Sequence, residues 1–339
     1  MENTLYPLEF KPIFREKIWG GKKIKTKFNF DIGTLKNCGE LWSLSGYPQE
    51  QSVISNGFLA GNELNEIVEI YMDDLVGDAI YDKFQNVFPI LVKILDAEDW
   101  LSIQVHPDDK LAQERGLAGG KTEMWYILDA DPKSQLIAGF SEKVNEHTYL
   151  RKLEEKKLPE IMNYEDVAKG DVFFMPSGRV HALGPGILLA EIQQTSDTTY
   201  RIYDWDRKDE NGNGRELHLK EAMQAIDFKL YDNYKTEYQT SFNKTTEIVD
   251  TPFFTTNIIQ LNKAIKKDYS QLDSFVILLC IEGEFGYKNE FEHQGKIRAG
   301  ESLLIPALHH EINIYPIKDC KILEIYIIIN EEKDKGKIL

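Results

Sequence analysis

The stretch KGDVFFMPSGRVHALG, Lys169 to Gly184, predicts a turn, an apolar strand and a sharp corner that delivers a histidine. The glycine-acid turn leads into four apolar residues that are typical of a buried strand. Pro176 and Gly178 then break the strand, and His181 follows. A single histidine is commonly a core or surface residue bonded to a backbone carbonyl, so the neighbouring segments decide whether His181 has a function.

Composition indicates a folded, acidic protein. The chain has 339 residues, of which 42% are hydrophobic, and its formal charge is −16. Such a charge argues against broad nucleic-acid binding, which needs a basic face. We see no signal peptide and no apolar run of about 20 residues that could span a membrane. Three widely spaced cysteines fit a reducing compartment, so we expect a soluble cytoplasmic protein that binds neither nucleic acid nor membranes. The sequence carries no signal for an oligomeric state.

Short strands separated by turn signals dominate the chain. Apolar periodicity predicts three helices, in the segments 62–77, 141–157 and 216–228. The expected strands are FPILVKIL, WLSIQVH, EMWYIL, SQLIAGF, DVFFMP and GILLAEIQQ. Many short strands of this kind favour a mostly β fold with jelly-roll barrels and a few helices.

The last third of the chain repeats this pattern. AGESLLIP matches KGDVFFMP position for position, so Pro306 corresponds to Pro176. The second copy has Leu308 in place of the glycine and Glu311 in place of His181. We therefore expect two stacked barrels: a metal-binding domain over 1–228, and a second, degenerate domain without metal ligands over 229–339.

Two of the predicted strands carry polar side chains on one face. Because side chains alternate along a strand, Ser102, Gln104 and His106 point one way in WLSIQVH. The same rule puts Lys121, Glu123 and Trp125 together in KTEMWYIL. A half-exposed strand alone gives the same alternation, but two such strands and the His181 corner fall in one predicted barrel.

Four of these side chains form a set suited to a divalent metal. They are Gln104, His106, Glu123 and His181. Two imidazoles, a carboxylate and an amide oxygen suit zinc or another divalent first-row metal. One carboxylate against a 2+ ion leaves a net charge of roughly +1, which suits an anionic intermediate.

These motifs resemble a known family. KGDVFFMPSGRVH fits the second cupin signature at every fixed position. SIQVHPD, the Lys121–Glu123 pair, PSGRVHAL, EIQQTSDTTYRIYDWDR, REKIWGG and CGELWSLS resemble type I phosphomannose isomerases over about residues 5–325. The chain lacks room for the inserted helical domain of the longer members and is similar to a short bacterial form.

The resemblance implies an activity and roles for several residues. Members of the family interconvert mannose 6-phosphate and fructose 6-phosphate with zinc, through an enediol-like intermediate. By match to the family pattern, Gln104, His106, Glu123 and His181 hold the metal. Arg201 would then lie beside the sugar, and Lys121 and Glu191 would reach the same cavity. Which of Lys121, Glu191 and Arg201 moves the proton stays open at this point.

Other residues can be interpreted either as binding residues or as ordinary structural residues. Trp19 is a sugar-stacking platform if the resemblance holds, and otherwise a core aromatic at a tight turn. Ser102 is a candidate hydroxyl contact to the sugar. The candidates for a phosphate pocket are Arg201, Lys121, Lys22 and Lys23, since phosphate recognition uses cationic side chains.

Three rival functions differ from the leading one. A two-barrel cupin could bind or sense a sugar without turnover, or isomerise another aldose. A cupin oxygenase holding Fe(II) presents two histidines and a carboxylate. The additional Gln104 and the YRIYDW run speak against the oxygenase.

Overall fold

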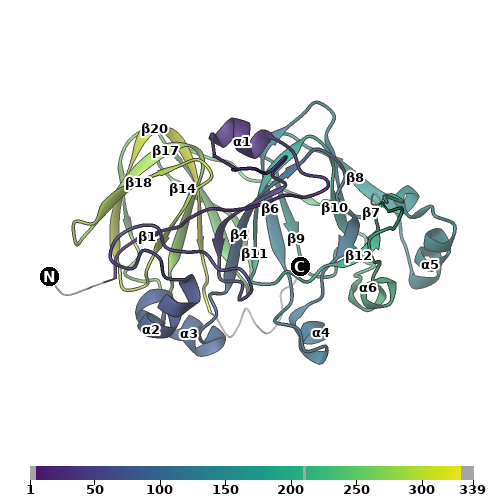
Figure 1. Ribbon diagram of the computed structural model, residues 1–339, viewed down its shortest axis with the longest axis horizontal. Helices are drawn as coiled ribbons and strands as arrows, with labels where there is room; N and C mark the ends of the chain where they lie inside the picture. The colour runs from purple at the N-terminus through teal and green to yellow at the C-terminus, as the bar shows by residue number, and fades with distance from the viewer. Residues whose placement is uncertain (1–4, 209–210, 330–339) are drawn as a thin grey trace. The chain divides into compact units, whose positions relative to one another are not determined.

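The structure, a computed structural model, describes residues 5–208 and 211–329 and consists mostly of β-strands, as predicted (Figure 1). Its contacts divide the chain into two compact units. The first unit comprises Met1–Ile13, Leu41–Lys93 and Glu237–Leu339, and the second comprises Phe14–Glu40 and Ile94–Thr236. Among the described residues, no helix is long and apolar enough to cross a membrane.

This division differs from the expected domain boundary. Residues before 228 join the C-terminal barrel of the first unit because they hydrogen-bond to it. Strand β1 (Leu8–Glu9) pairs with β19 (Ser302–Ile305), and the N–H of Ala307 donates to the carbonyl of Leu75 at 2.9 Å. The expected domains, 1–228 and 229–339, therefore remain a prediction about folding units rather than a description of these contacts.

Two antiparallel sheets of the second unit enclose a barrel. One sheet has the order β12-β5-β10-β7-β8, and the other contains β13-β9-β6-β11-β4. The first sheet's strands are β5 (Ile103–Val105), β7 (Gln135–Phe140), β8 (Met162–Asp166), β10 (His181–Leu183) and β12 (Tyr200–Tyr203). The second sheet's strands are β4 (Ile90–Ala97), β6 (Glu123–Ala130), β9 (Val172–Met175), β11 (Ile187–Gln194) and β13 (Lys235–Thr236).

Strand alternation sets the two cores of this unit. Leu136 and Leu183 point into the barrel, where they share a buried cluster with Trp125 and Leu189 from the opposite sheet. Their neighbour Ile137 points outward and joins a second cluster with residues of α5 (Glu146–Glu154) and α6 (Leu219–Ala225). The two helices thus cover the outer face of the sheet that carries β10 (Figure 1).

The first unit contains the second predicted barrel. Its sheet has the order β1-β19-β17-β20-β15-β14, with β16 on β20 and β18 on β17. Its further strands are β14 (Thr245–Asp250), β15 (Thr255–Leu261), β16 (Ile265–Asp268), β17 (Val276–Asn289), β18 (Gln294–Arg298) and β20 (Glu311–Tyr326). β19 occupies the place in this repeat that β9 has in the second unit, as the AGESLLIP match predicts. Strands β2 (Ile13–Arg15) and β3 (Glu40–Ser45) lie where the chain passes between the units.

The three predicted helices are present with shorter bounds. They are α2 (Leu64–Val76), α5 and α6. α5 begins late because the side chain of Asn145 caps it by accepting from the N–H of Thr148. Sequence periodicity missed α1 (Lys23–Phe28), α3 (Asp78–Phe84), α4 (Asp109–Glu114) and the 3₁₀ turn Leu158–Ile161, which are all short.

Candidate metal centre

Three neighbouring strands of one sheet bring the candidate side chains to the same level of the barrel. His181 begins β10 and lies directly opposite Gln104 on β5. Arg201 on β12 lies opposite Gln104 from the other side. Because directly opposed residues of antiparallel strands present their side chains on the same face, the three residues form one row. The corner at Pro176 and Gly178 thus starts β10 at the level where β5 ends.

Glu123 reaches the same place from the opposite sheet. It is the first residue of β6, and its Oε1 lies 3.5 Å from Nε2 of His181. Its Oε2 lies 3.5 Å from Nε2 of His106. Among the described residues, these three form the one histidine and carboxylate group whose ligand atoms all lie within 4.8 Å of one another. All three side chains are buried.

Backbone carbonyls fix both imidazoles in the tautomer that a metal needs. Nδ1 of His106 lies 2.9 Å from the carbonyl oxygen of Thr198, and Nδ1 of His181 lies 2.9 Å from that of Arg179. A carbonyl only accepts, so each Nδ1 carries the proton and each Nε2 offers its lone pair toward Glu123. Burial lowers the pKa of His181 to about 4, which keeps its ring neutral near pH 7.

Gln104 lies beside this group, with its amide nitrogen 3.3 Å from Nε2 of His181. The hydroxyl of Ser102 donates to the amide oxygen at 3.3 Å. Ligation of a metal by Oε1 requires the amide to turn over, and Ser102 could then accept from the amide nitrogen. The predicted face shared by Ser102 and Gln104 is thus present.

The carboxylate of Glu123 fits a bound cation. Both of its oxygens are fully buried, and neither accepts a hydrogen bond with good geometry from the described residues. Buried carboxylates are normally hydrogen-bonded or metal-bound, because removing their hydration is costly. The nearest cation is Lys121, whose Nζ lies 2.9 Å from Oε2. The residues present therefore suit a divalent ion.

Lys121 and Glu191 form the next layer of the site. Nζ of Lys121 lies 3.3 Å from Nε2 of His106 and 3.9 Å from Oε1 of Glu191. Burial alone would lower the pKa of Lys121, but the charges of Glu123 and Glu191 outweigh it and raise that pKa. Oε2 of Glu191 accepts from the indole N–H of Trp125 at 3.1 Å. A fixed cation and a fixed carboxylate therefore lie side by side in the interior of the barrel.

Arg201 does not belong to the neighbouring network of charged side chains. The sequence alone could not show whether it did. Asp204 binds Arg207 at 2.6 Å and Arg215 at 2.7 Å, and Arg201 makes no ion pair within the described chain. Its Nη1 donates to the carbonyl of Glu216 at 2.8 Å, and its buried Nε has no partner among the described residues. Burial lowers the pKa of the guanidinium, which is held by backbone rather than by an acid.

The structure places the remaining candidates differently. Trp19 is only 5% exposed and belongs to the apolar cluster of the barrel with Trp125. Its role as a sugar platform remains a prediction, and its packing fits the plain interpretation. Lys22 and Lys23 line a cavity at the other end of the barrel, so the structure does not bring them to this site.

Sequence reasoning missed the groups that orient the site. They are the carbonyls of Thr198 and Arg179 and the indole of Trp125. The contact of Trp125 could have been predicted, because this residue shares a strand face with Lys121 and Glu123 in KTEMWYIL. The carbonyl contacts depend on loop paths that no side-chain pattern encodes.

Comparison with known proteins gives consistent results. Residues 8–147 match the sequence model of the family described as phosphomannose isomerase type I, catalytic domain. The chain is 36% identical over 302 residues to a mannose-6-phosphate isomerase of Streptococcus mutans, covering 88% of this chain and 92% of the relative. It is 36% identical over 321 residues to one from Bacillus subtilis, covering 94% and 98%.

A solved structure agrees in fold. The crystal structure of the mannose 6-phosphate isomerase from Bacillus subtilis superimposes with a TM-score of 0.85 at 31% identity, covering 95% of this chain and 100% of that one. The match confirms the predicted mostly β, cupin-type architecture.

Proposed function

The chain belongs to the phosphomannose isomerase type I family, and from this we propose that it interconverts mannose 6-phosphate and fructose 6-phosphate with one bound divalent metal ion. The observation that carries the proposal is the convergence of His106, Glu123 and His181 in the interior of the barrel. A sugar bound at this group would also meet the Lys121–Glu191 pair.

We propose Gln104, His106, Glu123 and His181 as the ligands and zinc as the metal. Imidazole and carboxylate ligands suit zinc, and the neutral tautomers of both histidines favour its binding. When bound, the ion supplies positive charge that stabilises negative charge on the sugar oxygens. It would leave Lys121 beside Glu191, with Glu123 shared between the lysine and the ion.

The reaction moves hydrogen within one molecule. A proton leaves C2 of the aldose and another arrives at C1, while the O2 hydroxyl loses a proton and O1 gains one. The cis-enediol is the neutral intermediate of this exchange. The protein must therefore supply a base near C1 and C2 and a proton donor near O1 and O2.

Lys121 and Glu191 suit these two roles. The charges of Glu123 and Glu191 raise the pKa of Lys121, which favours its protonated form and the role of a donor to a sugar oxygen. Glu191 is a buried carboxylate held by Trp125, which makes it our choice for the base that shuttles the proton between C2 and C1. Arg201, held near Gln104 at the same level, suits the phosphate or the developing oxyanion.

A substrate panel tests the proposal. Zinc-loaded protein is given mannose 6-phosphate, other aldose 6-phosphates and free mannose, and ketose formation is followed. We expect fructose 6-phosphate from mannose 6-phosphate, with free mannose much slower. Faster turnover of another aldose would favour the isomerase of that sugar, and binding without any turnover would favour the sugar-binding alternative.

The cellular setting is part of the proposal. All three cysteines are free and buried, which supports a reducing compartment such as the cytoplasm. A sugar phosphate as the partner molecule agrees with such a location.

A further inference from the structure

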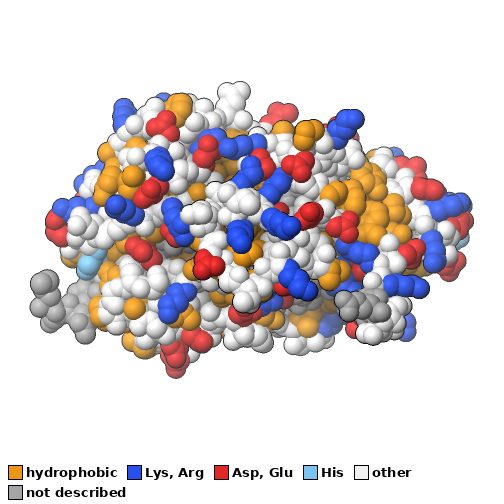
Figure 2. Space-filling view, turned by 45° about the horizontal axis from the view of Figure 1, so that its top comes forward, with side chains coloured by type: hydrophobic (Ala, Val, Ile, Leu, Met, Phe, Trp, Pro, Cys, Tyr) orange, Lys and Arg blue, Asp and Glu red, His pale blue; other side chains and the backbone are white. Residues whose placement is uncertain are grey.

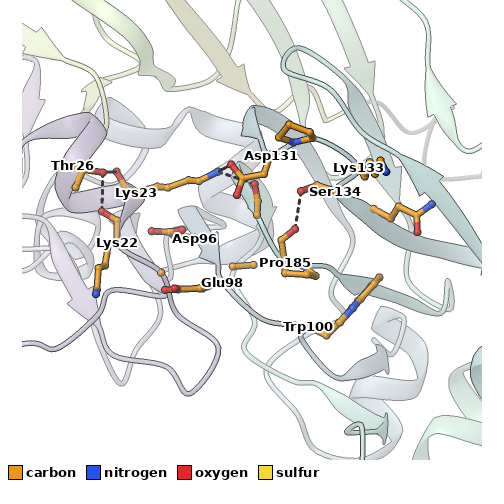
Figure 3. A pocket seen from close by; sticks show the side chains of 15 residues that line it. Lys22, Lys23, Thr26, Asp96, Glu98, Trp100, Asp131, Lys133, Ser134 and Pro185 are labelled. Atoms are coloured by element: carbon orange, nitrogen blue, oxygen red, sulfur yellow. Dashed lines mark hydrogen bonds and ion pairs between the residues drawn. The ribbon is translucent and has the colours of Figure 1, made fainter.

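A cavity of about 590 Å³ lies in the second unit at the far end of the barrel from the candidate metal centre (Figure 3). It is lined by the turns that follow β4, β6 and β10 and by the start of α1. Glu123 begins β6, and Asp131 in the cavity follows its end, roughly 26 Å away at ~3.3 Å per strand residue. Buried residues such as Trp125 and Leu189 fill the barrel between them.

Two lysines that line this cavity make no ion pair among the described residues, and the carboxylates of Asp96 and Glu98 line it as well. Nζ of Lys23 binds Asp131 at 2.8 Å and Asp129 at 3.1 Å, and Nζ of Lys27 binds Asp129 at 2.9 Å, so two lysines compensate these two carboxylates. Among the described residues, the ammonium groups of Lys22 and Lys133 make no ion pair or hydrogen bond, and both side chains line the cavity. Figure 3 shows Lys22 on the left of the cavity and Lys133 on its right.

A fixed aromatic ring forms one wall. Trp100 packs against Trp205 with ring centroids 5.0 Å apart and meets Tyr164 edge-on at 5.9 Å. The indole N–H of Trp205 donates to the carbonyl of Leu101 at 2.7 Å, which anchors the group. Figure 2 shows hydrophobic side chains gathered at the right of the molecule, where Figure 1 places β7 and β8. A rigid indole beside polar groups is a platform for the apolar face of a sugar ring.

The rim of the cavity contains a strained residue. Lys133 has φ 68, in the left-handed region that a lysine adopts only at a cost. Glycine would fit that turn better, yet the chain places a cationic side chain there. Ser134 and Gln135 follow it on the same wall, and Glu98 lies across the cavity near Lys22 (Figure 3). Hydroxyl, amide and carboxylate groups of this kind bind sugar hydroxyls.

We propose that this cavity is a second, non-catalytic site for a phosphorylated hexose. Trp100 stacks on the sugar ring, and Lys133 or Lys22 pairs with its phosphate. The Ser134 hydroxyl already donates to the carbonyl of Pro185 and the Gln135 amide to Asp166, so their oxygens and the Glu98 carboxylate accept from the sugar hydroxyls. The site goes beyond the proposed isomerase function and does not depend on it, because no residue of the metal centre contributes to it.

Calorimetric titration with sorbitol 6-phosphate tests the site. This probe lacks a carbonyl and cannot be isomerised. We expect it to bind His181→Ala protein, in which the metal centre is disabled. Combining that change with Lys133→Gly weakens binding by about tenfold or more, since a hydrogen bond to a charged group is lost. Lys22→Gln acts in the same direction.

Lys156→Gly is the matched control. Lys156 also has a left-handed φ, 57, but it lies at the end of α5 and not on the cavity. Both glycine variants relieve the same kind of backbone strain, so we expect the same small shift of the thermal midpoint in both, and only Lys133→Gly loses binding. No binding to His181→Ala protein, equal loss in both variants, or equally tight binding of unphosphorylated sorbitol would each overturn the proposal.

Discussion

Nε2 of His181 lies 3.5 Å from Oε1 of Glu123, although the two residues begin strands of different sheets, β10 and β6. The same imidazole holds the carbonyl of Arg179 through Nδ1, so its orientation does not depend on a metal. The orientation of His181 is therefore built into the folded chain, and we expect the metal to enter a site in which this ligand is already oriented.

Replacing His181 tests its assignment as a metal ligand. We expect His181→Ala to lose the bound metal and the isomerase activity together. Its metal affinity should fall by more than the roughly 10–100-fold typical of changes behind the ligands, because a ligand itself is lost. Elemental analysis after dialysis against a known metal concentration gives the result. His147→Ala, at an exposed position of α5, is the control. Full metal occupancy in His181→Ala would show that the ligand assignment is wrong.

Replacing Glu191 tests the proposed base. Glu191→Gln keeps the shape and an acceptor for the indole N–H of Trp125 but cannot take a proton. We expect kcat to fall by about 10²–10⁴-fold with the bound metal retained. Lys121→Met should also lower kcat, because Lys121 is the proposed donor. Exchange of the C2 hydrogen with deuterated solvent distinguishes the two: Glu191→Gln loses exchange. Unchanged exchange in that variant would assign the base elsewhere.

We expect Asp96 to make the stability of the protein depend on pH, independently of the candidate metal centre. Its side chain accepts from the N–H of Ile24 at 3.0 Å, and burial raises its pKa to about 6. An acid whose folded pKa is raised destabilises the folded state once it ionises. The resulting loss in free energy of unfolding is therefore complete well above pH 6. It disappears as the pH falls toward about 4, the pKa of an aspartate in the unfolded chain.

Asp96→Asn should remove this dependence. Relative to the wild type, we expect the variant to gain roughly 1–3 kcal/mol in free energy of unfolding between pH 4 and pH 7.5. Urea unfolding of the metal-free proteins at both pH values measures it. The exposed Asp82→Asn should show no such change. A constant difference between Asp96→Asn and wild type across this range would contradict the pKa of Asp96.

Much of the candidate metal centre could be predicted from sequence because its parts are local. Alternation along WLSIQVH and KTEMWYIL assigns side chains to faces, and the break at Pro176 and Gly178 locates the His181 corner. Each of these signals spans fewer than about ten residues. That Glu123 and His181 meet across the barrel required the fold class as well, which the repeat and the family motifs predicted.

The features that could not be predicted from the sequence depend on long-range packing. Lys22 and Trp19 are three residues apart, yet the lysine lines a cavity while the tryptophan is buried in the core. No local pattern separates these outcomes, because each depends on which strand turn lies opposite. The same holds for β1, whose pairing with β19 joins segments from opposite ends of the chain.

Metal titration tests the central claim most directly. The protein is stripped with a chelator, zinc is returned in steps, and the conversion of mannose 6-phosphate to fructose 6-phosphate is measured against bound zinc per chain. We predict that activity disappears with the metal and returns linearly until one zinc is bound per chain. Turnover that persists in fully stripped protein would contradict the account.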